Sequence, residues 1–138
     1  MRIKIKISFL LFCASVILIS CGGRKKAVTN YFGIWDLVSA YETNVEGLNA
    51  TIEFRGKERI FGNSGCNNYS GSYGLNEENR TLSFGPLMST KMGCEEAKSN
   101  CQRLFFRALN NTANYLPKKE GIYLLNSNRK ILAFIKKR

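Results

Sequence analysis

Cysteine thiols and carboxylates are the side chains of this sequence that could do chemistry, because the chain contains no histidine. Without histidine, Ser-His and Cys-His nucleophile pairs and the common zinc sites cannot form. Cysteine-only metal sites need close pairs such as Cys-x-x-Cys, and none occurs. The acidic pairs Glu77-Glu78 and Glu95-Glu96 are adjacent in sequence, so their carboxylates do not converge as a catalytic pair must. We therefore expect a protein that is not an enzyme, with no catalytic residue, no metal and no cofactor.

The first 20 residues have the pattern of an export signal. A basic segment, residues 1–6, precedes an apolar run over residues 7–19, which is shorter than the roughly 20 residues that a membrane span needs. The following Leu18-Ile19-Ser20-Cys21 resembles the bacterial lipobox, which implies cleavage before Cys21 and acylation of its thiol and its new amine. Two or three acyl chains would anchor the protein stably to a membrane. The alternative is an ordinary signal peptide in which the cysteine occurs by chance.

The charge of the exported part bears on its partners and location. Residues 1–20 carry three of the 21 basic residues, so the chain from residue 21 on has a formal charge of about +8. An exported protein meets little nucleic acid, so we expect no nucleic acid partner. We interpret the basic cluster at residues 24–26 as part of a solvated, flexible tether over residues 21–30, with contact to anionic headgroups as the alternative. Gly22 stands where many inner-membrane lipoproteins have aspartate. We therefore expect the protein in the cell envelope, anchored to the outer membrane and facing the periplasm. We also expect it to be a monomer.

Three cysteines, Cys66, Cys94 and Cys101, lie in the part expected to be exported, where two of them should form a disulfide. If both lie on a helix, Cys94 and Cys101 are about 10 Å apart, which is too far for a disulfide. We favour Cys66–Cys94, which closes a loop of about 29 residues. Cys101 is then expected to be buried as a small apolar side chain. A Cys66–Cys101 disulfide remains the alternative.

Short alternating apolar runs, separated by glycine and asparagine turns, predict a mainly β (α+β) domain with about seven or eight strands and one helix. The expected strands cover residues 33–38, 50–55, 59–62, 70–75, 80–84, 115–117, 121–125 and 130–135, with loops at 39–48 and 85–93. In the expected helix, residues 95–110, four apolar side chains recur at helical spacing and should face inward: Leu104, Phe105, Ala108 and Leu109. Trp35, the only tryptophan, is interpreted as a core residue of the first strand.

Four motifs carry a resemblance to a known family. Residues 65–73 fit Gly-Cys-Asn-x-x-x-Gly-x-Tyr, and residues 90–94 fit Thr-[Lys/Arg]-Met-x-Cys. Residues 105–109 fit Phe-x-x-Ala-Leu, and residues 35–37 fit Trp-x-Leu. Together these motifs resemble the META domain (HslJ-like) family, over about residues 31 to 135. One position departs from the family pattern, because Gln102 stands where a glutamate is usual.

The resemblance implies a small, curved, barrel-like antiparallel sheet with one packed helix, and we expect this domain to cover residues 31–138. It also implies an envelope protein linked to stress, with no established catalytic activity. We interpret the two cysteine motifs, residues 65–73 and 90–94, as an architectural clasp, and a ligand-binding rim is the alternative. The candidate binding residues are Asn67, Asn68, Tyr69, Tyr73, Thr90, Met92 and Trp35.

Two hypotheses for the function follow from these residues. The first is a non-catalytic envelope lipoprotein that binds or stabilises another envelope component. The second is a small apolar-ligand binder that uses the barrel mouth, lined by Trp35, Tyr69, Tyr73 and Met92. An open apolar pocket beside the clasp would favour a ligand, whereas a filled interior with an exposed apolar patch would favour a protein partner.

Overall fold

The computed structural model describes residues 30–138. The predicted signal peptide, the predicted acylation of Cys21 and the predicted tether up to residue 29 fall outside this range. Across the described residues, no helix combines the length and the apolar character needed to cross a bilayer.

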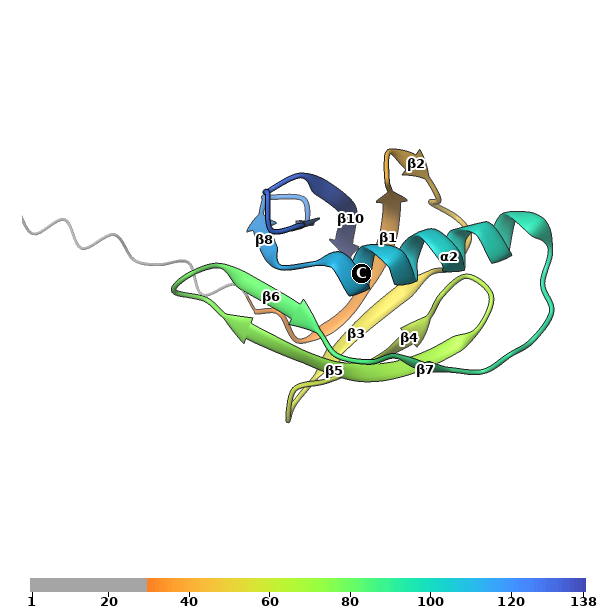
Figure 1. Ribbon diagram of the computed structural model, residues 1–138, viewed down its shortest axis with the longest axis horizontal. Helices are drawn as coiled ribbons and strands as arrows, with labels where there is room; N and C mark the ends of the chain where they lie inside the picture. Colours follow the sequence, from red (N-terminus) through yellow and green to blue (C-terminus); the bar gives the residue numbers. More distant parts are fainter. Residues whose placement is uncertain (1–29) are drawn as a thin grey trace, which may run out of the picture.

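Ten strands and one helix are formed by residues 30–138 (Figure 1). The strands are β1 (Gly33–Ala40), β2 (Thr43–Asn44), β3 (Thr51–Arg55), β4 (Arg59–Asn63), β5 (Asn68–Asn76), β6 (Thr81–Phe84), β7 (Met88–Ser89), β8 (Asn114–Pro117), β9 (Ile122–Leu125) and β10 (Ile131–Lys137). The helix, α2, spans Glu96–Asn111 and connects β7 to β8. Its first turn carries Glu96, a charge that the helix dipole favours at that end.

Eight of the strands close into an antiparallel barrel. Around the ring the order is β1-β3-β4-β5-β6-β8-β9-β10, and β10 pairs with β1 to complete it. At this closure Trp35 lies opposite Lys137. The two short strands β2 and β7 lie outside the ring and pair with β1 and β5. The predicted fold class, a mainly β antiparallel barrel with one packed helix, is confirmed.

Side chains fill the barrel interior. Every strand of the ring contributes at least one buried apolar residue, because alternate side chains of a strand point to the same face. The helix α2 packs against β1, β6, β9 and β10, and the four residues predicted to face inward are all buried: Leu104, Phe105, Ala108 and Leu109. The core is therefore shared between the barrel and one face of the helix.

Because neighbouring strands of the ring run antiparallel, the connections between them lie at the two ends of the barrel, which we call the tether end and the clasp end. The tether end holds residue 30, the β3–β4, β5–β6 and β8–β9 turns, and the C-terminal residues that follow β10. The clasp end holds the β4–β5 turn, the segment around β7 and the β9–β10 turn. Figure 1 shows β6 and β8 on the opposite side of the domain from the N-terminal end of α2.

Two predicted loops contain strands. Residues 39–48 were predicted to form a loop, but β1 continues to Ala40, β2 follows, and Val45 is buried. The predicted loop at residues 85–93 contains β7, which pairs with Tyr69 and Ser70. A strand of two residues is too short to show an alternating pattern. Its formation depends on pairing with a neighbouring strand. The helix begins and ends one residue later than predicted.

Gly62 lies where two strands approach closely, and its replacement tests this packing. A Cβ atom there would collide with the backbone carbonyl oxygen of Thr51, which cannot move without disturbing β3. We expect Gly62→Ala to lower the free energy of unfolding by about 2–3 kcal/mol, measured by urea denaturation. The control is Gly56→Ala in the β3–β4 turn, where no atom lies within 4 Å of the new Cβ. Equal stability of the two variants would contradict this packing.

Candidate functional site

The side-chain amide of Asn67 joins both cysteine motifs to the helix. This side chain is 2% exposed. Its Oδ1 accepts hydrogen bonds from the Thr90 hydroxyl (2.8 Å) and from the backbone N–H of Met92 (2.7 Å). Its Nδ2 donates to Oε1 of Gln102 in α2 (3.0 Å). One buried amide therefore binds the β4–β5 turn to the segment before the helix and to the helix itself.

Ser64 orders the turn that presents Asn67. The backbone N–H of Ser64 donates to the carbonyl oxygen of Asn67 (2.8 Å), and the N–H of Asn67 donates back to the Ser64 hydroxyl (2.9 Å). The hydroxyl itself donates to Oε1 of Gln102 (2.6 Å). Gly65, which follows Ser64 in this turn, has a backbone φ of +91°, a conformation that residues other than glycine rarely adopt. The turn is thus closed locally and tied to α2 through the same glutamine oxygen.

Gln102 fills its position as a neutral acceptor. Its Oε1 accepts hydrogen bonds from both Ser64 and Asn67. Neither bond needs a negative charge, because an amide oxygen has two lone pairs. The departure from the glutamate of the family pattern therefore leaves the geometry of the clasp intact, and it removes a partly buried charge.

The disulfide links the same two segments covalently. Cys66 is joined to Cys94, with 5.8 Å between their Cα atoms, so the favoured pairing is present. Cys101 is free and fully buried, as predicted. Burial raises the pKa of its thiol, which keeps it in the unreactive protonated form. A Cβ atom on Gly65 would lie 3.2 Å from this sulfur, so the glycine allows the turn to rest on the helix.

Three of the candidate binding residues, Tyr69, Tyr73 and Trp35, are core residues. Tyr69 is 4% exposed, its hydroxyl donates to the carbonyl oxygen of Thr51 (2.9 Å), and its ring meets Phe105 and Phe106 edge to face. Burial raises the pKa of this phenol well above its ordinary value, so it stays a neutral donor. Tyr73 is also buried. Both tyrosines pack in the core, and Tyr69 also borders a surface hollow.

Two further candidates are exposed, and Trp35 lies elsewhere. Asn68 is exposed and accepts a hydrogen bond from the Asn63 side chain. The Met92 side chain is 57% exposed, whereas its backbone N–H bonds to Asn67. Trp35 belongs to the tether end, where its indole N–H donates to the carbonyl oxygen of Tyr31 (3.0 Å). Trp35 and Tyr69 line two different hollows of the described surface, so the barrel-mouth lining by Trp35, Tyr69, Tyr73 and Met92 stays a prediction.

A shallow hollow lies beside the clasp on the outer surface. It has a volume of about 360 Å³ and is open to solvent. Its lining comes from β4, β5 and β7 and the residue after β7: Phe61, Asn68, Tyr69, Ser70, Met88, Ser89 and Thr90. Met88 is 67% exposed there. Within residues 30–138, no cluster of three or more Cys, Asp or Glu side chains could hold a metal ion.

The sequence reasoning missed two participants in the clasp. Ser64 was not singled out, although it immediately precedes the glycine of the first motif. Gln102 was noted only as a departure from a pattern. Its contacts with Ser64 and Asn67 come from residues 38 and 35 positions away, which local spacing cannot reveal.

Removal of the Asn67 amide tests its role as the common partner. In Asn67→Ala the Thr90 hydroxyl and the Met92 N–H lose their partner inside the protein, and Gln102 keeps only its bond from Ser64. We expect the free energy of unfolding to fall by about 2–4 kcal/mol in urea denaturation. The neighbouring exposed Asn68→Ala serves as the control and should change stability by under about 1 kcal/mol. If both variants unfold at the same urea concentration, the amide does not have this role.

The disulfide can be tested independently of the hydrogen bonds. A loop of about 29 residues predicts that the Cys66→Ala, Cys94→Ala double variant loses about 3–4 kcal/mol of unfolding free energy. Addition of a reductant should destabilise the wild-type protein by a similar amount and leave the double variant unchanged. A reductant effect on the double variant would show that another thiol pair is involved.

The chain was compared with known families, curated proteins and solved structures. Residues 31–138 match the META domain, and no curated protein matches. A DUF4847 family protein from Bacteroides vulgatus ATCC 8482 is similar, with a TM-score of 0.54 and 18% identity over 66% of this chain and 60% of that one. A protein from Burkholderia xenovorans gives a TM-score of 0.53 and 25% identity over 78% of this chain and 79% of that one.

A further solved structure, determined by NMR, gives a TM-score of 0.55 and 20% identity over 77% of this chain and 89% of that one. The weaker identities show the fold alone, and the chain spans under two thirds of the Bacteroides protein. The family match, in contrast, extends over the whole described barrel and helix except residue 30. The chain therefore belongs to the META domain family.

Proposed function

We propose that this protein is a non-catalytic, lipid-anchored component of the bacterial cell envelope that binds another envelope protein through the hollow beside the clasp. The observation that carries this proposal is the exposed apolar surface there, next to a barrel whose interior is filled. Met88 and Met92 are 67% and 57% exposed. Methionine side chains are flexible and polarisable, and they suit adaptable protein-binding surfaces.

The chemistry of the clasp supports a binding role over a catalytic one. The amide of Asn67 and the Ser64 hydroxyl are already bonded within the protein. The thiol of Cys101 is buried, which raises its pKa and disfavours the reactive thiolate. A rigid clasp whose polar groups are already hydrogen-bonded instead provides a fixed support for the surface beside it.

The rigidity of the support matters for binding energy. The disulfide and the hydrogen bonds of Asn67 order the segment around β7 before any partner arrives. A preorganised surface avoids the entropy cost of ordering a loop during binding. The exposed methionines can still adapt their rotamers to the partner.

Site-specific photo-crosslinking tests the partner. A photoreactive amino acid at Met88 is expected to capture an envelope protein in intact cells, because this residue is exposed and lines the hollow. The same amino acid at Lys130, an exposed residue of the β9–β10 turn, is the control. The proposal predicts one dominant crosslinked protein at Met88 that is absent at Lys130. A co-purified small molecule with no crosslinked protein would favour the alternative, a small apolar-ligand binder.

Acylation of Cys21 is tested by growth with a labelled fatty acid. We expect the label in the wild-type protein and no label in Cys21→Ser, since the thiol is the attachment point. Cys13→Ser is the matched control, because Cys13 lies within the predicted signal peptide and should leave labelling unchanged. Absence of label in the wild-type protein would contradict the predicted lipid anchor and leave the partner experiment unaffected.

A further inference from the structure

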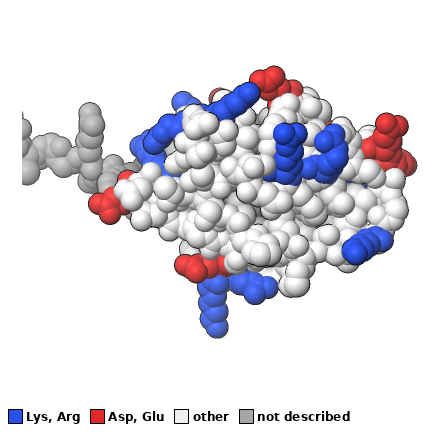
Figure 2. Space-filling view, in the orientation of Figure 1, with Lys and Arg blue, Asp and Glu red and all other residues white. Residues whose placement is uncertain are grey.

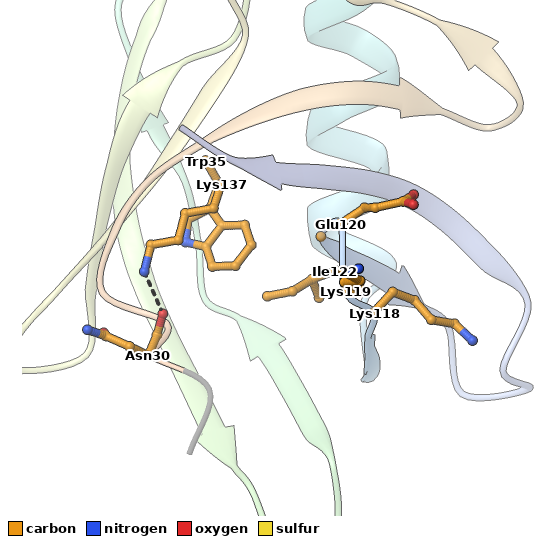
Figure 3. Close-up of a pocket in the computed structure, with 8 residues that line it drawn as sticks. Asn30, Trp35, Lys118, Lys119, Glu120, Ile122 and Lys137 are labelled. Atoms are coloured by element: carbon orange, nitrogen blue, oxygen red, sulfur yellow. Dashed lines mark hydrogen bonds between the residues drawn. The ribbon is translucent and has the colours of Figure 1, made fainter. Parts of the chain in front are cut away.

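Lysine side chains gather around an apolar hollow at the tether end. The hollow has a volume of about 250 Å³ (Figure 3). Its apolar part comes from Trp35 and Ile122, which are 3% and 2% exposed. Its edge is formed by exposed charged residues of the β8–β9 turn and the C-terminal end of β10: Lys118, Lys119, Glu120 and Lys137.

Lys137 ties the start of the described chain to this hollow. Its ammonium group donates a hydrogen bond to the carbonyl oxygen of Asn30 (2.9 Å) and lies 5.7 Å from the centre of the Trp35 ring. Figure 3 shows Lys137 beside the Trp35 ring, with its bond to Asn30 dashed. Asn30, the first described residue, therefore lies at the rim of the hollow.

The length of that chain limits the distance from the anchor. Nine peptide units connect Cys21 to Asn30, and a fully extended chain of that length reaches about 30 Å. An anchor at Cys21 would hold the tether end no farther than this from the membrane. Three further basic residues, Arg24, Lys25 and Lys26, lie within the connecting segment.

Charges of both signs occur at this end, and their distribution sets the orientation. Asp36 forms an ion pair with Arg138, and Glu77 and Glu78 belong to the β5–β6 turn. Lys118, Lys119 and Lys137 lie on the side of the β8–β9 turn and the end of β10, where Glu120 is the one carboxylate among the residues that line the hollow. In Figure 2, blue side chains gather at the upper left of the domain, and a red group lies below them.

An exposed aromatic side chain lies where the tether joins the barrel. Phe32 is 57% exposed and precedes β1 by one residue. Aromatic side chains favour the interface between water and lipid, and lysines favour anionic headgroups at the same depth.

We propose that the side of the tether end where Lys118, Lys119 and Lys137 surround the hollow over Trp35 docks on a bilayer surface of anionic phospholipid. The lysines lie over the headgroup phosphates, and the apolar hollow faces the lipid. This inference rests on the proposed anchor for its biological setting, because the anchor brings the surface within reach of lipid. The affinity of the surface for lipid is a separate property, and it is measured without the anchor.

Vesicle binding by the chain from residue 21 on, carrying Cys21→Ser, provides the test, because this chain retains the whole described barrel. We expect it to sediment with vesicles of equal parts phosphatidylglycerol and phosphatidylcholine, and not with phosphatidylcholine alone. Binding should fall steeply between about 0.1 M and about 1 M salt, as the Debye length shrinks from about 10 Å to about 3 Å. The fluorescence of Trp35, the only tryptophan, should be quenched by brominated phosphatidylglycerol.

Matched charge variants locate the surface. Lys118→Gln with Lys119→Gln should weaken binding about 25-fold, since each lysine near an anionic surface contributes about fivefold. Lys91→Gln with Lys130→Gln removes the same charge at the clasp end, where both lysines are exposed, and should change binding less than about twofold. Equal losses in the two pairs, or no binding to anionic vesicles, would overturn the inference. Either result leaves the fatty-acid labelling of Cys21, and hence the proposed anchor, untouched.

Discussion

A single buried amide organises the clasp end of this barrel. Asn67 bonds simultaneously to Thr90, to the backbone of Met92 and to Gln102, and so connects the β4–β5 turn to residues 23 to 35 positions further along the chain. A buried amide must satisfy all its polar atoms, because an unpaired one is costly away from water. That requirement places the turn, the segment before the helix and the helix in one mutual arrangement. The disulfide stabilises the same arrangement in another way, because it restricts the conformations of the unfolded chain.

The two ends of the barrel differ in chemistry because the pairing order separates them. The clasp end gathers neutral amides, hydroxyls and a disulfide, which hold one another and leave exposed methionines beside them. The tether end gathers exposed lysines around Trp35. The core between the ends is filled, so neither surface depends on a cavity through the barrel. One small domain can therefore present two independent surfaces, one apolar and adaptable, the other basic.

Local patterns in the sequence were sufficient for most of the fold. Alternation predicted the long strands, and the spacing of Leu104, Phe105, Ala108 and Leu109 predicted the buried face of the helix. The strands β2 and β7 could not be predicted, since two residues carry no periodicity and pair only once a neighbour is in place. The candidate site was predicted by residue type but not by arrangement. Trp35 and Tyr69 both suggested a ligand surface, yet their positions on different ends depend on register around the closed ring.

The closure between the first and last strands of the ring has a consequence for biogenesis. The first strand of the ring, β1, obtains one of its two neighbours only from β10, the last strand of the described residues. A chain synthesised from its N-terminus onward therefore carries an unpaired edge on β1 until β10 is present. Exposed edges of this kind recruit foreign strands. Ring completion is thus a late event in maturation, and a chain shortened by even one strand at its C-terminus would leave both β1 and β9 open to misassembly.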